Sequence, residues 1–140
     1  MTLSSVSPNH TIDLKITGIQ EPVIYSYFNR LNQGDFQGVS ELFAPDGCLY
    51  APFESGICGR EAIEQYLEAE AQGMTAFPRS GILETSPDND PRYKLMGIVK
   101  TSFFTVNVGW TIEINPEKQI TSVTVKLLAE LQELLGLQRH

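Results

Sequence analysis

The sequence predicts an α+β domain in which helices cover one face of a curved, mostly antiparallel sheet. The first observation is an alternation late in the chain, where every second residue is apolar: Val106, Val108, Trp110, Ile112 and Ile114. A period of two indicates a strand with one buried face. The second observation is the order of the patterns, because helical periodicity comes first along the chain and strand-like stretches follow. This order is typical of α+β domains.

Two helices are expected near the start of the chain, over residues 21–32 and, in a shorter form, over about 36–43. Pro22 suits the first turn of the first helix because proline lacks an amide hydrogen. Tyr27 lies on the apolar stripe of that helix together with Val23 and Leu31, so its side chain should face the core. Gly34 then ends the first helix, and Asp35 can cap the second.

A third helix is expected from residue 60 to about residue 73. Its apolar stripe contains a carboxylate, because Glu70 shares that face with Ile63, Leu67 and Met74. A salt bridge within the monomer would explain this placement, and a contact to a partner subunit would explain it equally well.

Strands complete the expected fold. A turn at 45–47 precedes a brief strand at 48–51, and longer strands follow at 76–85, 93–104, 106–114 and 120–128. Turns are well signalled at 86–92 and 115–118, and weakly signalled at 103–107, where neither Gly nor Pro occurs. The ends are expected to be a polar arm over 1–12 and a short amphipathic helix over 129–137, which leaves a domain over 13–128 and a tail over 129–140.

Composition limits the function classes. A chain of 140 residues forms one domain with a sizeable core, and 17 acidic against 10 basic residues give a net charge of −7. An acidic chain without a basic cluster argues against nucleic-acid binding, which requires Lys and Arg to neutralise phosphates. The first residues resemble no targeting peptide, and no apolar run is long enough to span a bilayer, so a cytoplasmic location is expected.

The sequence lacks the usual signatures of catalysis. Its histidines, His10 and His140, lie in the terminal segments, which disfavours a Ser-His or Cys-His nucleophilic site. There is no Gly-rich phosphate loop and no metal-binding spacing of His and carboxylates, so no metal is expected. Cys48 and Cys58 are too few for a disulfide framework, and we interpret them as buried reduced cysteines, with a redox role as the alternative.

Tyr27 and Trp110 are the candidate binding residues that the pattern itself supplies. Tyr27 brings a hydroxyl, and Trp110 an indole N–H, to faces that should be buried. Buried Tyr and Trp side chains normally require a polar partner. Two donors that converge in an apolar space suit one carbonyl acceptor on a ligand, whereas two core aromatics bonded to backbone would need no ligand.

Several stretches together resemble one family. They are KITGIQEPVIYSYFNRLNQGDF, LFAPDGCLYAPFESGICGREAI, YLEAEAQ, TSFFTVNVGW and INPEKQ, within a likeness that spans about residues 14–135. They are similar to the C-terminal domain of the cyanobacterial orange carotenoid protein. Since no helical carotenoid-binding domain precedes them in this sequence, we expect a stand-alone homolog of that domain. The resemblance implies an NTF2-like fold, a cone-shaped half barrel around a deep apolar pocket.

The resemblance also implies roles for individual residues. Tyr27 and Trp110 match the two family residues that hydrogen-bond the keto ring of a carotenoid. Phe103 takes the place of a second family tryptophan, and Glu70 matches a glutamate that forms a salt bridge between domains. Met74 and Val125 are expected to line the same carotenoid-binding pocket.

The resemblance finally implies a function and partners. The chain should bind a ketocarotenoid such as canthaxanthin or echinenone. It should take the pigment from a membrane and deliver it to a helical carotenoid-binding homolog that quenches singlet oxygen, which is a photoprotective role. Because one domain cannot enclose the whole pigment, we expect a homodimer that shares one molecule. No enzyme activity is expected. The alternative is an enzyme of the ketosteroid isomerase or cyclase type, but Ala51, before Pro52, stands where the isomerase has its base.

Overall fold

The computed structural model describes residues 13–128. Within this range the order of elements is α1 (Pro22–Asn32), α2 (Phe36–Glu41), β1 (Phe43–Tyr50), β2 (Ile57–Cys58), α3 (Arg60–Glu70), β3 (Thr75–Ser86), β4 (Asn89–Lys100), β5 (Thr105–Ile114) and β6 (Ile120–Leu128). The predicted arm over 1–12 and the predicted helix over 129–137 lie outside the described residues. The helices-first order is confirmed, and none of the helices in the described range is long and apolar enough to cross a bilayer.

The helices begin and end at the residues that their capping chemistry selects. Pro22 opens α1, and the Glu21 carboxylate accepts a hydrogen bond from the Val23 N–H in its first turn. Gly34 follows α1 with φ +74°, a conformation that glycine adopts without steric cost. The Asp35 carboxylate then accepts from the Gly38 N–H at 3.0 Å and caps α2. Helix α3 ends at Glu70, earlier than the expected end near residue 73.

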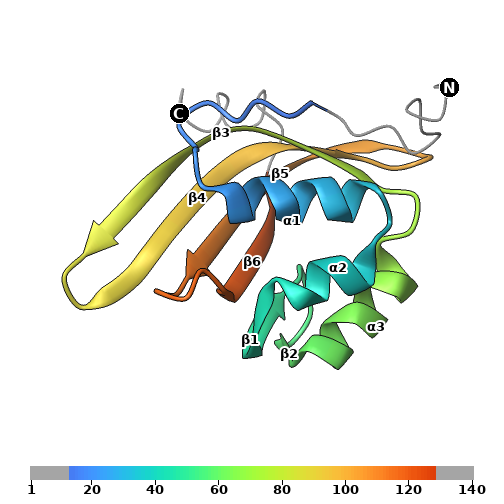
Figure 1. Ribbon diagram of the computed structural model, residues 1–140. Helices are drawn as coiled ribbons and strands as arrows, with labels where there is room; N and C mark the ends of the chain where they lie inside the picture. Colours follow the sequence, from blue (N-terminus) through green and yellow to red (C-terminus); the bar gives the residue numbers. More distant parts are fainter. Residues whose placement is uncertain (1–12, 129–140) are drawn as a thin grey trace, which may run out of the picture.

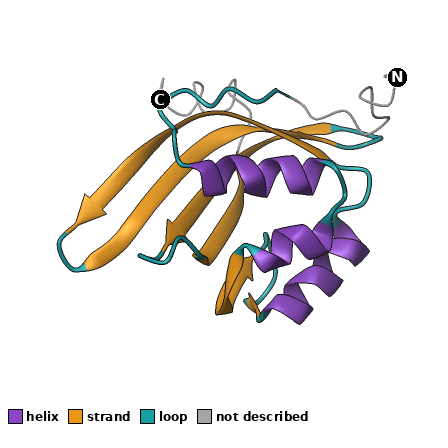
Figure 2. Ribbon diagram, viewed as in Figure 1, coloured by secondary structure: helices purple, strands orange, loops and turns teal. Residues whose placement is uncertain are grey.

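The described strands form one six-stranded sheet in the order β2-β1-β6-β5-β4-β3. All neighbouring strands are antiparallel except β1 and β6, which run parallel. The sheet is strongly curved, and α1 lies across its concave side, while α2 and α3 pack beside each other near β1 (Figures 1 and 2). The predicted α+β half barrel is therefore confirmed.

The alternation predicted around Trp110 is confirmed. In β5, Val108, Trp110, Ile112 and Ile114 are buried, and the residues between them are more exposed. The buried face of β5 meets the buried face of α1, where the Phe28 ring lies edge-on to the Trp110 indole at a centroid distance of 5.0 Å. This contact places the core between α1 and the middle of the sheet.

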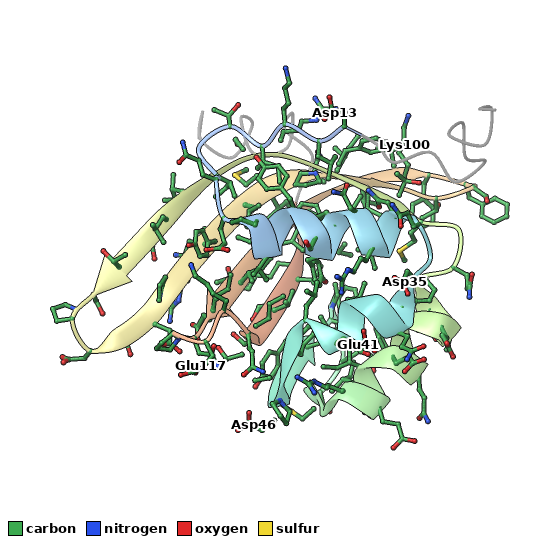
Figure 3. The ribbon with its side chains drawn as sticks, in the orientation of Figure 1. Asp13, Asp35, Glu41, Asp46, Lys100 and Glu117 are labelled. Carbon is green, nitrogen blue, oxygen red and sulfur yellow. A yellow bond between two sulfur atoms is a disulfide. The ribbon has the colours of Figure 1, made fainter. Side chains whose placement is uncertain are left out.

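The labelled carboxylates lie at the periphery of the molecule, away from this core (Figure 3). Asp35, Glu41, Asp46 and Glu117 are all exposed. Their position is typical of acidic side chains, which are rarely buried unless they are paired.

Two predicted strand boundaries are wrong. The turn expected at 45–47 is part of β1, where the pairing with β6 shifts register between Phe43 and Cys48, so these turn-forming residues make an irregularity within a strand. Strand β4 begins at Asn89 and ends at Lys100, not at residue 104. There the Thr101 hydroxyl accepts from the N–H groups of Phe103 and Phe104 and closes the turn without Gly or Pro.

The interpretation of the cysteines as buried and reduced is also wrong. Cys48 and Cys58 form a disulfide between directly opposed positions of β1 and β2. Cys58 is exposed and Cys48 is half-buried. The two-residue strand β2 pairs with β1 and brings the two sulfur atoms together.

Candidate functional site

An apolar pocket opens between α1, α3 and one end of the sheet. It is lined by Tyr27 and Leu31 from α1, by Tyr66, Leu67 and Glu70 from α3, by Ala71 and Met74 after α3, by Leu49, Ala51 and Pro52 at the end of β1, and by Ala76, Val99, Trp110 and Val125 from the sheet. Its volume is about 120 Å³. Whole small-molecule ligands occupy roughly 300–1,000 Å³, so this pocket accommodates one end of a longer molecule.

Tyr27 reaches the pocket from the middle of α1. Its side chain is only 2% exposed, and its ring lies edge-on to Phe28 at 5.0 Å and to Phe43 at 6.4 Å. Burial raises the pKa of the Tyr27 phenol, so the group stays a neutral hydrogen-bond donor. The four-residue periodicity of α1 aims this residue inward, as the sequence predicts.

Trp110 reaches the same pocket from β5. It pairs with Leu95 on one side and with Val125 on the other, and its side chain is 3% exposed. The pocket therefore receives a phenol from the helix layer and an indole from the sheet layer.

The two donors have no partner in the described part of the chain. Among residues 13–128, no backbone or side-chain group forms a hydrogen bond with the Tyr27 hydroxyl or the Trp110 indole N–H. Both residues line the pocket and their donor atoms are not sealed from it, so an acceptor in the pocket can reach them. Bonding of both groups to backbone is not found among residues 13–128, and the arrangement suits a ligand that brings an acceptor.

Five of the six predicted site residues line the pocket. Tyr27, Trp110, Met74 and Val125 line it, and Glu70 lines it from the exposed end of α3. Phe103 does not line it, because the ring lies in the β4–β5 turn and is 91% exposed. Within the described range, Glu70 forms no salt bridge, so the salt bridge expected inside the monomer is absent there.

Tyr66 is a lining residue that the sequence alone did not indicate. Burial raises the pKa of its phenol, and the nearby charges of Glu54 and Glu70 raise it further. Tyr66 lies three residues after Ile63 and next to Leu67, so the helical periodicity of α3 is the signal that could have indicated it. Ala51 and Pro52 were noted only as the place of an isomerase base, and the structure makes them part of the wall.

Several polar contacts hold the walls in place. The Asn32 side chain at the end of α1 donates to the Ala76 carbonyl at 2.9 Å and accepts from the Ala76 N–H at 2.7 Å. At the other end of α1, Glu21 pairs with Lys118 at 2.7 Å, between β5 and β6. Within residues 13–128 no group of three or more His, Cys, Asp or Glu residues could hold a metal ion.

Comparison with known proteins identifies relatives of this chain. It is 35% identical over 130 residues to an orange carotenoid-binding protein of Synechocystis sp. and 34% identical over 128 residues to that of Limnospira maxima. These matches cover 90% and 89% of this chain but 41% and 40% of the relatives, so the chain spans about two fifths of the length of the curated relatives it matches. No family model matches the chain.

Solved structures agree with these relatives. The orange carotenoid protein of Anabaena (Nostoc), described as binding canthaxanthin, aligns with a TM-score of 0.84 and 32% identity over 93% of this chain and 42% of that one. An NTF2-like protein from Cytophaga hutchinsonii aligns with a TM-score of 0.62 at 13% identity, over 89% of this chain and 99% of that one, and shows the fold alone. The expected NTF2-like fold is confirmed.

Proposed function

Because the chain is a homologue of the C-terminal, NTF2-like domain of the orange carotenoid proteins, we propose that it binds one end of a ketocarotenoid in the pocket between α1 and the sheet. The observation that carries the proposal is the pair of donors, Tyr27 and Trp110, that line an apolar pocket and have no acceptor among the described residues. A 4-keto ring supplies one carbonyl oxygen, with lone pairs for both donors, on an otherwise apolar body.

Burial and hydrogen bonding make contributions of different size to the free energy of pigment binding. Burial of several hundred Å² of apolar pigment, at about 25 cal/mol per Å², favours binding by on the order of 10 kcal/mol before the costs of association. Two neutral hydrogen bonds add only about 0.5–1.5 kcal/mol each. The apolar wall should therefore set the affinity, and Tyr27 and Trp110 should select a ring with a keto group and fix its orientation.

The small pocket leaves most of a long pigment outside, so a second apolar body must cover it. We assign this role to a second copy of the chain. The strand ends at the pocket expose a rim of large apolar side chains: Tyr50, Phe53, Met74, Phe103, Phe104 and Leu127. Phe103, Phe104 and Leu127 share one end of the sheet because β6 ends where β5 begins. Met74 lines the pocket, and Tyr50 and Phe53 flank its lining residues Ala51 and Pro52. Glu70 lies at this rim, where a partner could reach it, and Phe103 can contact pigment outside the pocket.

The same rim supports a carrier role. A dimer that holds the pigment by its two ends can release it when the copies separate, first to one acceptor surface and then to another. We propose uptake from a membrane, where ketocarotenoids dissolve, and delivery to a helical carotenoid-binding homolog that serves photoprotection. On this proposal the protein is a carrier and not an enzyme, and no carboxylate but Glu70 lines the pocket in the described part of the chain.

Co-expression with canthaxanthin tests the proposal. The wild-type chain should purify as a coloured protein, and Tyr27→Phe and Trp110→Phe should each shift the absorption and weaken pigment retention about 2- to 12-fold, the equivalent of one hydrogen bond. Tyr93→Phe is the matched control, because Tyr93 is also buried and lines a different pocket beside Glu21. A colourless wild-type protein, or variants that match it in spectrum and retention, would refute the proposal.

A further inference from the structure

The Cys48–Cys58 disulfide closes a segment that forms one wall of the pocket. The two cysteines lie directly opposite each other in β1 and β2, separated by 10 positions in the sequence. Between them, Leu49, Ala51 and Pro52 line the pocket. The covalent bond therefore encloses the chain that contacts a bound ligand from the β1 side.

The ends of this segment are also held by the Gly59 N–H, which donates to the Gly47 carbonyl at 2.9 Å, and by Ile57, which packs against the core. Few contacts hold the residues between. Strand β2 has two residues, stands at the edge of the sheet, and pairs only with β1. Inside the loop, the Glu54 N–H donates to the Ala51 carbonyl at 3.2 Å, and the Tyr50 ring lies so close to Gly56 that a Cβ there would meet it at 2.8 Å. Phe53 is 95% exposed and contributes no burial. A segment with so little packing depends on its covalent bond for its position.

The disulfide is also within reach of a reductant. Cys58 is exposed, whereas Cys48 is half-buried. A thiolate can therefore approach the Cys58 sulfur, with Cys48 as the leaving group. These are the two cysteines of the sequence, so thiol chemistry of the chain is confined to this site.

We propose that the Cys48–Cys58 disulfide is a redox latch on the pocket. In the oxidised protein it holds residues 51–56 against the end of the ligand, and in the reduced protein this segment moves away and the ligand exchanges faster. The identity of the ligand rests on the function proposed above, but the latch itself does not.

The redox step involves a dithiol reductant. One thiolate of the reductant attacks the Cys58 sulfur, the Cys48–Cys58 bond breaks, and Cys48 leaves as a thiolate that takes up a proton. The second thiol of the reductant then attacks the mixed disulfide and releases Cys58. The protein gains two electrons and two protons, and the reductant becomes a disulfide.

Hydrogen exchange tests the latch without a ligand. In the full chain, amides of residues 50–57 should exchange at least tenfold faster after treatment with dithiothreitol and should open separately from β5, whose amides accelerate only as far as global stability falls. The Cys48→Ser/Cys58→Ser variant should match the reduced protein and should not respond to dithiothreitol. Equal exchange of residues 50–57 in both redox states would overturn the proposal. Opening of residues 50–57 only together with β5 would also overturn it, because the disulfide would then support the whole fold and not this segment in particular.

Pigment transfer tests the consequence. Protein loaded with canthaxanthin should lose it to phosphatidylcholine vesicles at least threefold faster after reduction, and the double serine variant should release it at the faster rate in both conditions. If reduction loosens residues 50–57 but leaves the rate of pigment transfer unchanged, the proposal that the disulfide controls release of the ligand is overturned. If neither redox state takes up canthaxanthin, the function proposed above fails, and hydrogen exchange still decides whether the segment is latched.

Discussion

Glu21 is a nearly buried carboxylate at the start of α1. Burial by itself raises its pKa, but hydrogen bonds from Lys118 and from the Val23 N–H, together with the charge of Lys118, outweigh burial and hold the pKa below the ordinary value of 4.5. A carboxyl group whose pKa is lower in the folded than in the unfolded protein stabilises the fold above the unfolded pKa. This contribution is lost as the pH falls through the folded pKa.

Lys118→Met should therefore reduce the dependence of the free energy of unfolding on pH in acidic solution. The variant removes the charge that favours ionised Glu21, so the free energy of unfolding should fall near pH 7 and depend less on pH below about 4.5. Urea denaturation between pH 3 and pH 7 measures this. Lys94→Met is the matched control, because the Lys94 pair with Glu84 is exposed on both sides. If the free energy of unfolding of the variant depends on pH as that of the wild type does, the Glu21–Lys118 pair contributes nothing to stability.

Tyr27 sets the pH range of the proposed pigment contact. Its pKa is raised by burial from the model-compound value of 10.0, so the phenol should remain a donor in mildly alkaline solution. The absorption of bound canthaxanthin should accordingly stay constant between about pH 7 and pH 10. A spectral transition in this range, present in the wild type and missing in Tyr27→Phe, would contradict the burial of the phenol.

At the scale of elements, the end of α1 is joined to the start of β3 by one side chain. Asn32 makes two hydrogen bonds to the backbone of Ala76, which lines the pocket. Because both bonds link segments that are distant in sequence, they fix the separation of the helix layer from the sheet edge.

Asn32→Ala should destabilise the protein by about 1–3 kcal/mol, because it leaves the Ala76 N–H and carbonyl without their partners. Chemical denaturation at pH 7 gives the change. Gln37→Ala serves as the control, since its side chain bonds only to exposed Glu41. A loss below about 0.5 kcal/mol would mean that water replaces both bonds without cost.

The disulfide between β1 and β2 should also stabilise the fold. A crosslink across 10 positions restricts the unfolded chain and is worth about 2–3 kcal/mol in the chain-entropy estimate. Cys48→Ser/Cys58→Ser should lose this amount, and the reduced wild type should lose a similar amount when both are unfolded in denaturant. A variant as stable as the oxidised protein would show that the crosslink does not constrain the unfolded state.

At the scale of the whole molecule, the apolar rim of the pocket should be the dimer contact. Native mass spectrometry of loaded protein should show one canthaxanthin for two chains. Met74→Lys puts a charge on the exposed rim and should weaken the loaded dimer at least tenfold, because the charge would be buried between the copies. Gln72→Lys adds the same charge to an exposed neighbour that does not line the pocket. One pigment on each separate chain would contradict shared binding.

Periodicity was enough to orient the two candidate binding residues. The four-residue spacing on α1 aims Tyr27 inward, and the two-residue spacing on β5 aims Trp110 inward, because helices and strands repeat locally whatever packs against them. The predicted helices and the α+β class follow from the same local rules. The resemblance in sequence added the meaning of these two donors, which periodicity alone leaves open.

The tertiary structure decided which segments meet. The pairing of Cys48 with Cys58 depends on β2, whose two residues are too short for any pattern. Tyr66 joins the pocket because α3 packs beside the end of β1, and Phe103 stays outside because Thr101 closes the turn early. Contacts of this kind join residues that are far apart in the chain or lie in irregular loops, where no repeat in the sequence records them. The sequence therefore determined the two layers and their inward faces, and only the packing of the layers determined the walls and the rim of the pocket and the pairing of the two cysteines.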